Sequence, residues 1–269
     1  MSGAQGAAAR LSVGLYLVMG WVGGGAFAGP GDLPLAPLQE ACARGSPQSC
    51  NNLGLLYKHG RGVTQDEPRA AALFQKACTA GLAEGCSNLG LMYDEGRGVT
   101  QDEPRAASLF EKACTGGLAV GCNNLGRLYS YGRGVPQDEP RAATLLEKAC
   151  TGGAAEGCYN LGMLFSKGRG VTQNEARAAT LFEKACTGGE PRGCLALGKR
   201  CEEGRGVPKN EARAATLFEK ACTGGEAKGC YNLGVFYEEG RGVPKDPRRA
   251  AAMYEKACHA GISQACAPQ

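Results

Sequence analysis

A tetrapeptide, Gly-Arg-Gly-Val, returns along this chain at a fixed interval of 36 residues. Its first glycine is residue 60, and the later copies begin at residues 96, 132, 168, 204 and 240. The cysteines keep the same interval, because fourteen of the 15 form pairs with seven residues between the partners. A period of this length is typical of solenoids, in which each unit buries its apolar face by stacking on its neighbours. The sequence therefore predicts one repeat protein and no independent second domain.

The first half of each unit has the pattern of a short helix. One face of a helix is formed by residues at i, i+3, i+4 and i+7, and in one unit these are Cys86, Leu89, Gly90 and Tyr93. Gly90 has no side chain, so we expect a neighbouring helix to approach closely there. Gly96 is expected to end the helix in the left-handed conformation.

The second half of each unit predicts another helix. Asp102 stands where an N-cap belongs, and the equivalent position of every unit holds Asp or Asn. An apolar stripe follows at Ala106, Phe110 and Ala113. Helices of about 12 residues are marginal alone in water, so each pair must stack on the next. The predicted fold is all-α, a right-handed α/α solenoid of helix pairs with a 36-residue period.

Residues 1–28 have the layout of a secretory signal peptide. Arg10 is their only charged residue, an apolar run follows it, and the segment ends in Ala-Phe-Ala, whose small residues are typical of a cleavage site. We expect cleavage after Ala28, with retention as a membrane anchor as the alternative. Residues 29–34 are interpreted as a short linker. Residues 35–269 are interpreted as the solenoid, a partial first helix followed by six helix pairs.

Export places the predicted protein outside the cytoplasm, so the expected location is secreted or periplasmic. After signal cleavage no apolar run is long enough to span a bilayer. The formal net charge is only +4, and the absence of a concentrated basic stripe argues against a nucleic-acid partner. We expect the mature chain to be a monomer.

The paired cysteines are interpreted as disulfides, because zinc sites usually bring cysteines two to four residues apart and export favours oxidation. Each expected bridge joins the last turn of one helix to the first turn of the next. The expected pairs are Cys42–Cys50, Cys78–Cys86, Cys114–Cys122, Cys150–Cys158, Cys186–Cys194, Cys222–Cys230 and Cys258–Cys266.

An alternative pairing would join the two helices of one unit, for example Cys50 with Cys78. That scheme leaves Cys42 and Cys266 without partners, whereas the shorter loops use all fourteen cysteines. Cys201 is left over, at a position that holds Tyr or Phe in the other units. We expect a buried free thiol there, and a reactive or intermolecular thiol is the alternative.

The Gly-Arg-Gly-Val segment is interpreted as a turn that ends a helix and whose valine packs inward. A phosphate-binding loop is the alternative, but such a loop needs a strand before it and a Gly-Lys-Ser/Thr ending. Both are missing here. The six arginines of these segments, from Arg61 to Arg241, are expected to pair with neighbouring acidic side chains.

The strings EKACTGG and GC-x-NLG-x-LY followed by GRGV resemble Sel1-like repeats, which are relatives of the tetratricopeptide repeat. The paired C-x7-C resembles more closely the cysteine-rich Hcp-type subfamily, and the resemblance covers about residues 35 to 269. It implies a disulfide-linked α/α solenoid in an oxidising compartment and an adaptor that binds a peptide or protein. Hcp-type members are also described as penicillin-binding proteins with weak β-lactamase activity. The resemblance therefore adds a β-lactam or cell-wall fragment as a further ligand class.

The residues of serine β-lactamase chemistry are not recognisable in this sequence. No serine has a lysine three positions later, and Lys-Thr-Gly does not occur. His59 and His259 are the only histidines, and they lie 200 residues apart. We therefore name no catalytic residue, no metal ligand and no cofactor, and leave weak β-lactam hydrolysis as the alternative activity.

One stripe of the first helix of each unit changes freely between units, and in solenoids this side lines the concave, binding surface. Beside the stripe an asparagine recurs, and its amide could bind the backbone of an extended peptide. The predicted binding residues are Asn52, Asn88, Asn124, Asn160, Asn232, Tyr159 and Tyr231. The alternatives are a merely solvated face and asparagines that bond the backbone of the neighbouring unit.

Overall fold

The computed structural model describes residues 35–266. The predicted signal peptide, 1–28, and the linker, 29–34, lie outside the described residues, as do residues 267–269. The described part is entirely helical and contains no strand. Its elements are α1 (Leu35–Ala43), α2 (Pro47–His59), α3 (Glu67–Thr79), α4 (Ala83–Glu95), α5 (Glu103–Thr115), α6 (Ala119–Tyr131), α7 (Glu139–Thr151), α8 (Ala155–Lys167), α9 (Glu175–Thr187), α10 (Pro191–Glu203), α11 (Glu211–Thr223), α12 (Ala227–Glu239), α13 (Pro247–His259) and a 3₁₀ turn, η1 (Ser263–Ala265).

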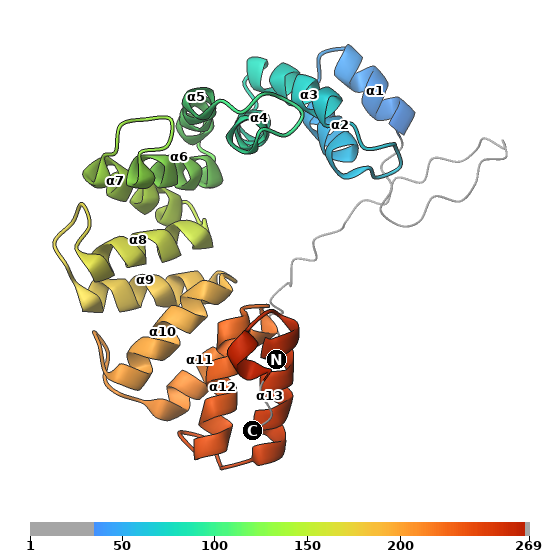
Figure 1. Ribbon diagram of the computed structural model, residues 1–269. Helices are drawn as coiled ribbons and strands as arrows, with labels where there is room; N and C mark the ends of the chain where they lie inside the picture. Colours follow the sequence, from blue (N-terminus) through green and yellow to red (C-terminus); the bar gives the residue numbers. More distant parts are fainter. Residues whose placement is uncertain (1–34, 267–269) are drawn as a thin grey trace, which may run out of the picture. The chain divides into compact units, whose positions relative to one another are not determined.

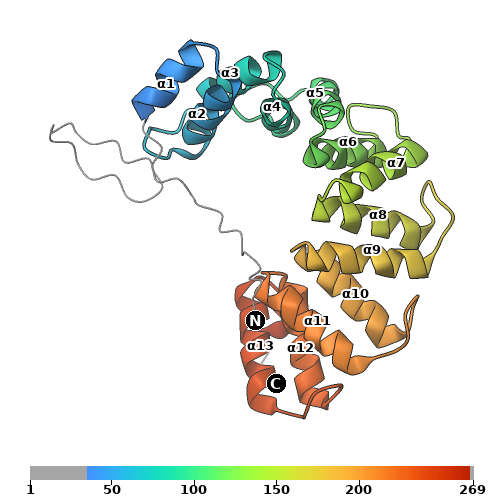
Figure 2. The same cartoon turned by 180° about the vertical axis from the view of Figure 1, so that it is seen from behind.

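Each 36-residue unit contributes one even-numbered and one odd-numbered helix, and every helix packs on the next along the chain (Figure 1). The view from behind shows the same order from α1 to α13 (Figure 2). Even-numbered helices also contact one another across units: α2 with α4, α4 with α6, α6 with α8 and α8 with α10. The all-α solenoid of helix pairs that the period predicts is confirmed.

Local signals in the sequence set the helix ends. Asp102 accepts a hydrogen bond from the Arg105 backbone N–H at 2.9 Å, which satisfies one of the free amides at the start of α5. Asp or Asn does the same for every odd-numbered helix from α3 to α13. Gly96 ends α4 with φ +67°, in the left-handed region where glycine carries no steric cost. Both capping predictions are confirmed.

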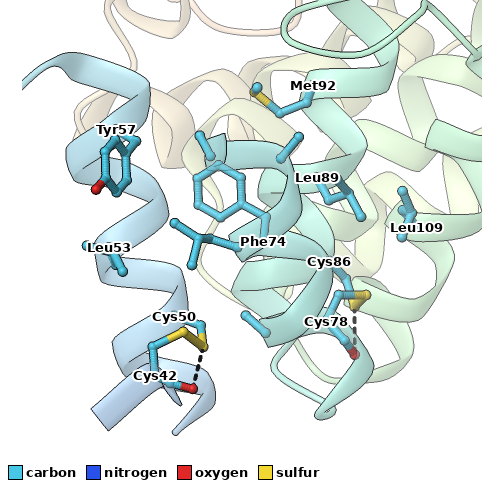
Figure 3. Close-up of a cluster of buried hydrophobic side chains, with 14 of the residues drawn as sticks. Cys42, Cys50, Leu53, Tyr57, Phe74, Cys78, Cys86, Leu89, Met92 and Leu109 are labelled. Carbon is cyan, nitrogen blue, oxygen red and sulfur yellow. Dashed lines mark hydrogen bonds between the residues drawn. A yellow bond between two sulfur atoms is a disulfide. The ribbon is translucent and has the colours of Figure 1, made fainter. Parts of the chain in front are cut away.

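Close approach of the two helices within a unit depends on one glycine of the even-numbered helix. A Cβ at Gly54 would lie 2.6 Å from Cε1 of Phe74, and one at Gly90 would lie 2.7 Å from Cε1 of Phe110. Figure 3 shows the fully buried Phe74 ring beside Leu53 and Tyr57. The aromatic ring of α3 thus packs directly on the backbone of α2, as the sequence predicts for Gly90.

All seven expected disulfides are present. Six join the end of an odd-numbered helix to the first turn of the next helix, and the seventh joins α13 to Cys266, directly after η1. The Cα atoms of Cys78 and Cys86 are 4.4 Å apart, and most of the bonded cysteines lie in the core (Figure 3). Cys201 is free and buried. Burial raises the pKa of its thiol.

The Gly-Arg-Gly-Val turns join consecutive units through ion pairs. In five of the six turns the arginine contacts the first glutamate of the preceding odd-numbered helix, as in Arg133 Nε to Glu103 Oε1 at 2.9 Å. Arg61 has no such partner among residues 35–266, because α1 is only a partial unit. The valines are partly buried against the core. The expected turn and its ion pairs are therefore confirmed from the second unit onward.

One helix departs from the pattern. Arg200 of α10 stands where the other even-numbered helices place a core Leu, Met or Phe, and it is 8% exposed. Its guanidinium donates to Ser166 Oγ at 2.5 Å, lies 3.4 Å from Glu175 Oε2 and covers the Phe182 ring at 4.3 Å. Burial lowers the pKa of Arg200. Arg200 and the adjacent Cys201 thus replace two apolar or aromatic residues together, and they make α10 the irregular repeat.

Candidate functional site

The changing stripe of the sequence lies on one side of the even-numbered helices, which we call the even-helix face. It consists of the residues two before and one, two, five, eight and nine after the first-turn cysteine. At 100° per residue these positions fall within about 120° of the helix circumference. On α8 they are Glu156, Tyr159, Asn160, Met163, Ser166 and Lys167. The recurring asparagines belong to this face.

Two of the predicted asparagines bind an asparagine of the preceding unit. Asn88 Nδ2 donates to Asn51 Oδ1 at 2.8 Å, and Asn160 Nδ2 donates to Asn123 Oδ1 at 2.8 Å. The partner is a side-chain amide and not the neighbouring backbone that the alternative reading proposed. Each of the two donating amides keeps its carbonyl oxygen and a second N–H for other contacts.

The other predicted asparagines do not form this bond, because the preceding unit has no asparagine at the position that would face them. The residue of the preceding unit that would meet Asn232 is Leu195, and Asn52 has no complete unit before it. Asn124 is buried, and its Oδ1 accepts a long bond of 3.5 Å from Asn123. The asparagines therefore do not form one uniform ladder. Their predicted role in ligand binding stays a prediction.

The even-helix face carries a hollow of about 330 Å³ between α6 and α8, closed at one end by the start of α10. We call it the α6–α8 hollow. It brings the predicted residues Tyr159 and Asn160 together with Tyr131 and Met163. The predicted residues Asn52, Asn88, Asn232 and Tyr231 do not line it, and Asn124 lines a smaller gap between α4 and α6.

Two small side chains explain why the hollow opens at this unit. The equivalent gap between α4 and α6 measures only about 20 Å³ and is lined by Phe110 and Asp94. In the α6–α8 hollow the corresponding residues are Leu146 and Ser130. The other odd-numbered helices from α3 to α13 hold Phe or Tyr where α7 holds Leu146. A leucine and a serine thus leave space that a phenylalanine and an aspartate fill elsewhere.

Positive side chains dominate the wall of the hollow. Arg127, Lys167, Arg169 and Arg192 line it, with Glu156 as the single acid in the wall. Arg192 holds Glu190 through two hydrogen bonds of 2.7 and 3.1 Å and also lies 3.3 Å from Glu156. The hydrogen bonds from Arg192 hold the pKa of Glu190 below its ordinary value. No ion pair is found for Lys167 within residues 35–266.

The two tyrosines of the hollow have different environments. Tyr159 is half-buried, its pKa is raised by burial, and the Arg192 guanidinium covers its ring at 4.8 Å. Tyr131 is 66% exposed, and it and Val120 are the large hydrophobic residues of α6 that remain exposed. Exposed aromatic side chains beside a hollow are typical of protein-binding surfaces.

The sequence reasoning missed Tyr131, Leu146 and Arg192, although the sequence contains a signal for each. Position by position, Tyr131 is the single aromatic residue in a column that otherwise reads His59, Glu95, Lys167, Glu203 and Glu239. Leu146 is the single aliphatic residue in a column of aromatic ones, and Arg192 stands where α8 has Glu156. All three departures from the repeat's columns lie around the α6–α8 hollow, so the columns together point to this part of the chain.

The described part of the chain offers no cluster of three or more His, Cys, Asp or Glu side chains that could hold a metal ion. Its helices are also too short or too polar to cross a membrane.

Stacked helix pairs joined by a disulfide at each unit boundary define a disulfide-linked α/α solenoid. The chain belongs to the Sel1 repeat family, which matches residues 47–82, 83–118, 119–153, 155–190, 191–226 and 227–262. Proteins built from Sel1 repeats are scaffolds that typically mediate interactions between proteins. The comparison with curated proteins finds no match.

Solved structures of Sel1 repeat proteins are similar to this chain. A Sel1 repeat protein from Oxalobacter formigenes is 32% identical over 85% of this chain and 66% of its own, with a TM-score of 0.78. The protective antigen c5321 of uropathogenic Escherichia coli is 29% identical over 87% of this chain, with a TM-score of 0.77. This chain spans 50% of that antigen. Helicobacter pylori cysteine-rich protein B is 32% identical over 48% of this chain and 93% of its own, with a TM-score of 0.40.

Proposed function

We propose that this protein is an exported scaffold that binds a peptide or a peptide segment of a protein along the concave side of its solenoid. The observation that carries the proposal is the α6–α8 hollow, where exposed Tyr131 meets Tyr159 and Asn160. Contacts between successive even-numbered helices support the assignment of this side as the concave one, because helices crowd on the inner side of a curved row.

The chemistry of the face suits an extended backbone. Asn88 and Asn160 are held by their inter-unit bonds, so little side-chain entropy is lost when their remaining amide groups bind a ligand. Tyr131 and Tyr159 supply aromatic area at low entropic cost, because each has two side-chain torsions. A peptide that lies across α4, α6 and α8 would meet amides and aromatic rings in turn.

Seven disulfides support export. Such bonds persist in secreted and periplasmic proteins and are rare in the reducing cytosol. The proposed location is therefore an oxidising compartment outside the cytoplasm, reached after cleavage of residues 1–28.

A binding screen of the oxidised protein on an array of 12-residue peptides tests the proposal. Two variants alter the hollow: Tyr131→Ala removes an exposed ring, and Leu146→Phe restores the aromatic residue found in the other units. Both variants should have lower affinity for the peptides that the parent protein binds. Thr180→Ala, on the exposed side of α9, should keep the affinity of the parent protein. Binding that is equal in all four proteins would contradict the proposal.

A β-lactam is the competing ligand, and the positive wall of the α6–α8 hollow favours it because penicillins carry a carboxylate. Ser130 lines this hollow, but Arg133 stands three residues later, where serine β-lactamases have lysine. A chromogenic β-lactam assay on the purified oxidised protein separates the two functions. Turnover that disappears in Ser130→Ala would favour the enzyme over the scaffold.

A further inference from the structure

Among the Gly-Arg-Gly-Val arginines that form ion pairs, Arg169 at the α6–α8 hollow contacts one carboxylate, and each of the others contacts two or three: Arg97, Arg133, Arg205 and Arg241. Arg133 Nη2 donates to Asp94 at 2.9 Å while Arg133 Nε donates to Glu103. Arg241 Nη2 donates to Glu202 at 2.9 Å and to Glu211 at 3.5 Å. In both cases one carboxylate comes from the even-helix face of the preceding unit.

Arg169 lacks the carboxylate from that face. Its Nε donates to Glu139 at 2.6 Å, but its Nη2 donates to the main-chain carbonyl of Ser130 at 2.8 Å. Ser130 occupies the position that holds Asp94 and Glu202 in the other two units. A neutral carbonyl is a weaker partner for a guanidinium than a carboxylate. Arg169 therefore has one carboxylate partner, whereas Arg133 has two and Arg241, which also contacts Glu239, has three.

The surrounding charges add to this imbalance. Arg127 and Arg192 both form ion pairs with Glu156, with N–O distances of 4.0 and 3.3 Å, and Glu190 forms its ion pair with Arg192. Lys167 has no ion-pair partner in the described part of the chain. Four positive side chains thus face the carboxylates of Glu139, Glu156 and Glu190. The wall is more positive than its own acids can balance.

We infer that the α6–α8 hollow binds the side-chain carboxylate of an aspartate or glutamate within a peptide that lies along the even-helix face. The inference rests on the proposed function and names the ligand chemistry of its central contact. The carboxylate takes the place beside Arg169 that Asp94 takes beside Arg133, and Lys167 forms the second positive contact. Tyr131 and Tyr159 flank the adjacent peptide residues. The peptide continues past the hollow on both sides, because the face offers Asn88 before it and Asn232 after it.

The test uses 12-residue peptides with acetylated N-termini and amidated C-termini, each made with Glu and with Gln at a central position. Binding to the oxidised full chain is measured by fluorescence polarisation in 150 mM salt. Peptides that bind are expected to prefer Glu over Gln by tenfold or more. Equal affinity for Glu and Gln would overturn the carboxylate inference and leave the proposed function standing. Binding by no peptide would overturn both.

Two variants locate the contact. Ser130→Asp places the repeat's own carboxylate beside Arg169 and should reduce the affinity for Glu peptides at least tenfold, leaving Gln peptides nearly unchanged. Ser108→Asp makes the same charge change on the exposed side of α5, away from the even-helix face, and should keep the preference for Glu. Lys167→Gln should reduce the preference without loss of stability, because the exposed lysine has no ion pair to lose. Lys184→Gln on the exposed side of α9 is its control.

Peptides with free C-termini provide the last part of the test. A peptide that binds through its terminal carboxylate would gain affinity when the amide cap is removed and would be indifferent to Glu or Gln. That result would overturn the inference in favour of C-terminal capture. A preference for Glu that persists in both Ser130→Asp and Lys167→Gln would place the contact elsewhere on the face and also overturn it.

Discussion

Alanine at the second glycine of the Gly-Arg-Gly-Val turn tests how strongly one unit depends on the next. Gly98 has φ +68°, and a Cβ there would lie 2.3 Å from the carbonyl carbon of Glu67 and 2.5 Å from its oxygen. Both atoms belong to the backbone at the start of α3, so no side-chain rotation relieves the contact. The same turn in the first unit offers a matched control, because Gly62 has the same φ of +68° and no described atom within 4 Å.

The two substitutions share one cost and differ in another. A left-handed alanine costs about 1–2 kcal/mol in either turn. Carbon atoms in contact normally lie about 3.5–4.0 Å apart, so the Gly98 variant must move the turn away from α3 by more than an ångström. Overpacking of this kind typically costs about 1–3 kcal/mol, and movement of the turn also weakens the Arg97–Glu67 pair.

Urea unfolding of the oxidised proteins, followed by far-ultraviolet circular dichroism, measures the difference. Gly62→Ala should lower the free energy of unfolding by about 1–2 kcal/mol and Gly98→Ala by about 2–5 kcal/mol. For a chain of this size a difference of 3 kcal/mol corresponds to about 6–12 °C in Tm. Equal losses would refute the reasoning, because backbone conformation alone would then explain the repeated glycine.

Three further predictions concern thiols and charge. Cys201 should resist a thiol reagent at neutral pH in the native protein, because it is buried and its pKa is raised; mass spectrometry should show one label after denaturation without reduction and fifteen after reduction. Replacing Cys78 and Cys86 together by alanine should cost about 2.5 kcal/mol of unfolding free energy, the entropy of a nine-residue loop, and an unchanged urea midpoint would contradict this. Glu190→Gln should destabilise the protein at pH 7. The pKa of Glu190 is lowered in the folded state, so its stabilisation is present above the ordinary glutamate pKa and is lost as the pH falls below it. The difference in Tm between this variant and the parent should shrink below about pH 4. A difference that is constant with pH would exclude an electrostatic origin.

The features that could be predicted from the sequence depend on short-range rules that repeat in each unit. Asp102 caps a helix because its oxygen reaches an amide three residues later, and Gly96 ends one because only glycine adopts a positive φ without cost. Cys78 and Cys86 meet because both lie beside one tight turn. Each of these contacts spans fewer than ten residues, so spacing along the chain is sufficient to infer it.

The candidate site could be predicted only in part, because it depends on volumes and partners from different units. Whether a gap forms between α6 and α8 depends on Leu146, which belongs to α7, and on Ser130 of α6. How much of the Asn160 amide can bind a ligand depends on its hydrogen bond to Asn123, which lies 37 residues earlier. The asparagine column lies on the face of the even-numbered helices that carries the hollow, and Asn160 of this column lines it. Periodicity could not show which unit opens, because a hollow is a departure from the period.

Three departures from the repeat lie around the α6–α8 hollow and each carries an energetic cost, and this clustering argues for a role beyond packing. Leucine in place of phenylalanine at residue 146 gives up buried apolar area, worth roughly 25 cal/mol per Å². Serine at residue 130 leaves Arg169 with a single carboxylate partner, fewer than Arg133 or Arg241 has. Tyr131 exposes an aromatic ring where other units place a charged side chain or a histidine. All three lie around one hollow, so a single ligand that fills it and supplies a carboxylate would offset them together. If the three substitutions were unrelated to one another, we would expect them in different units of the solenoid.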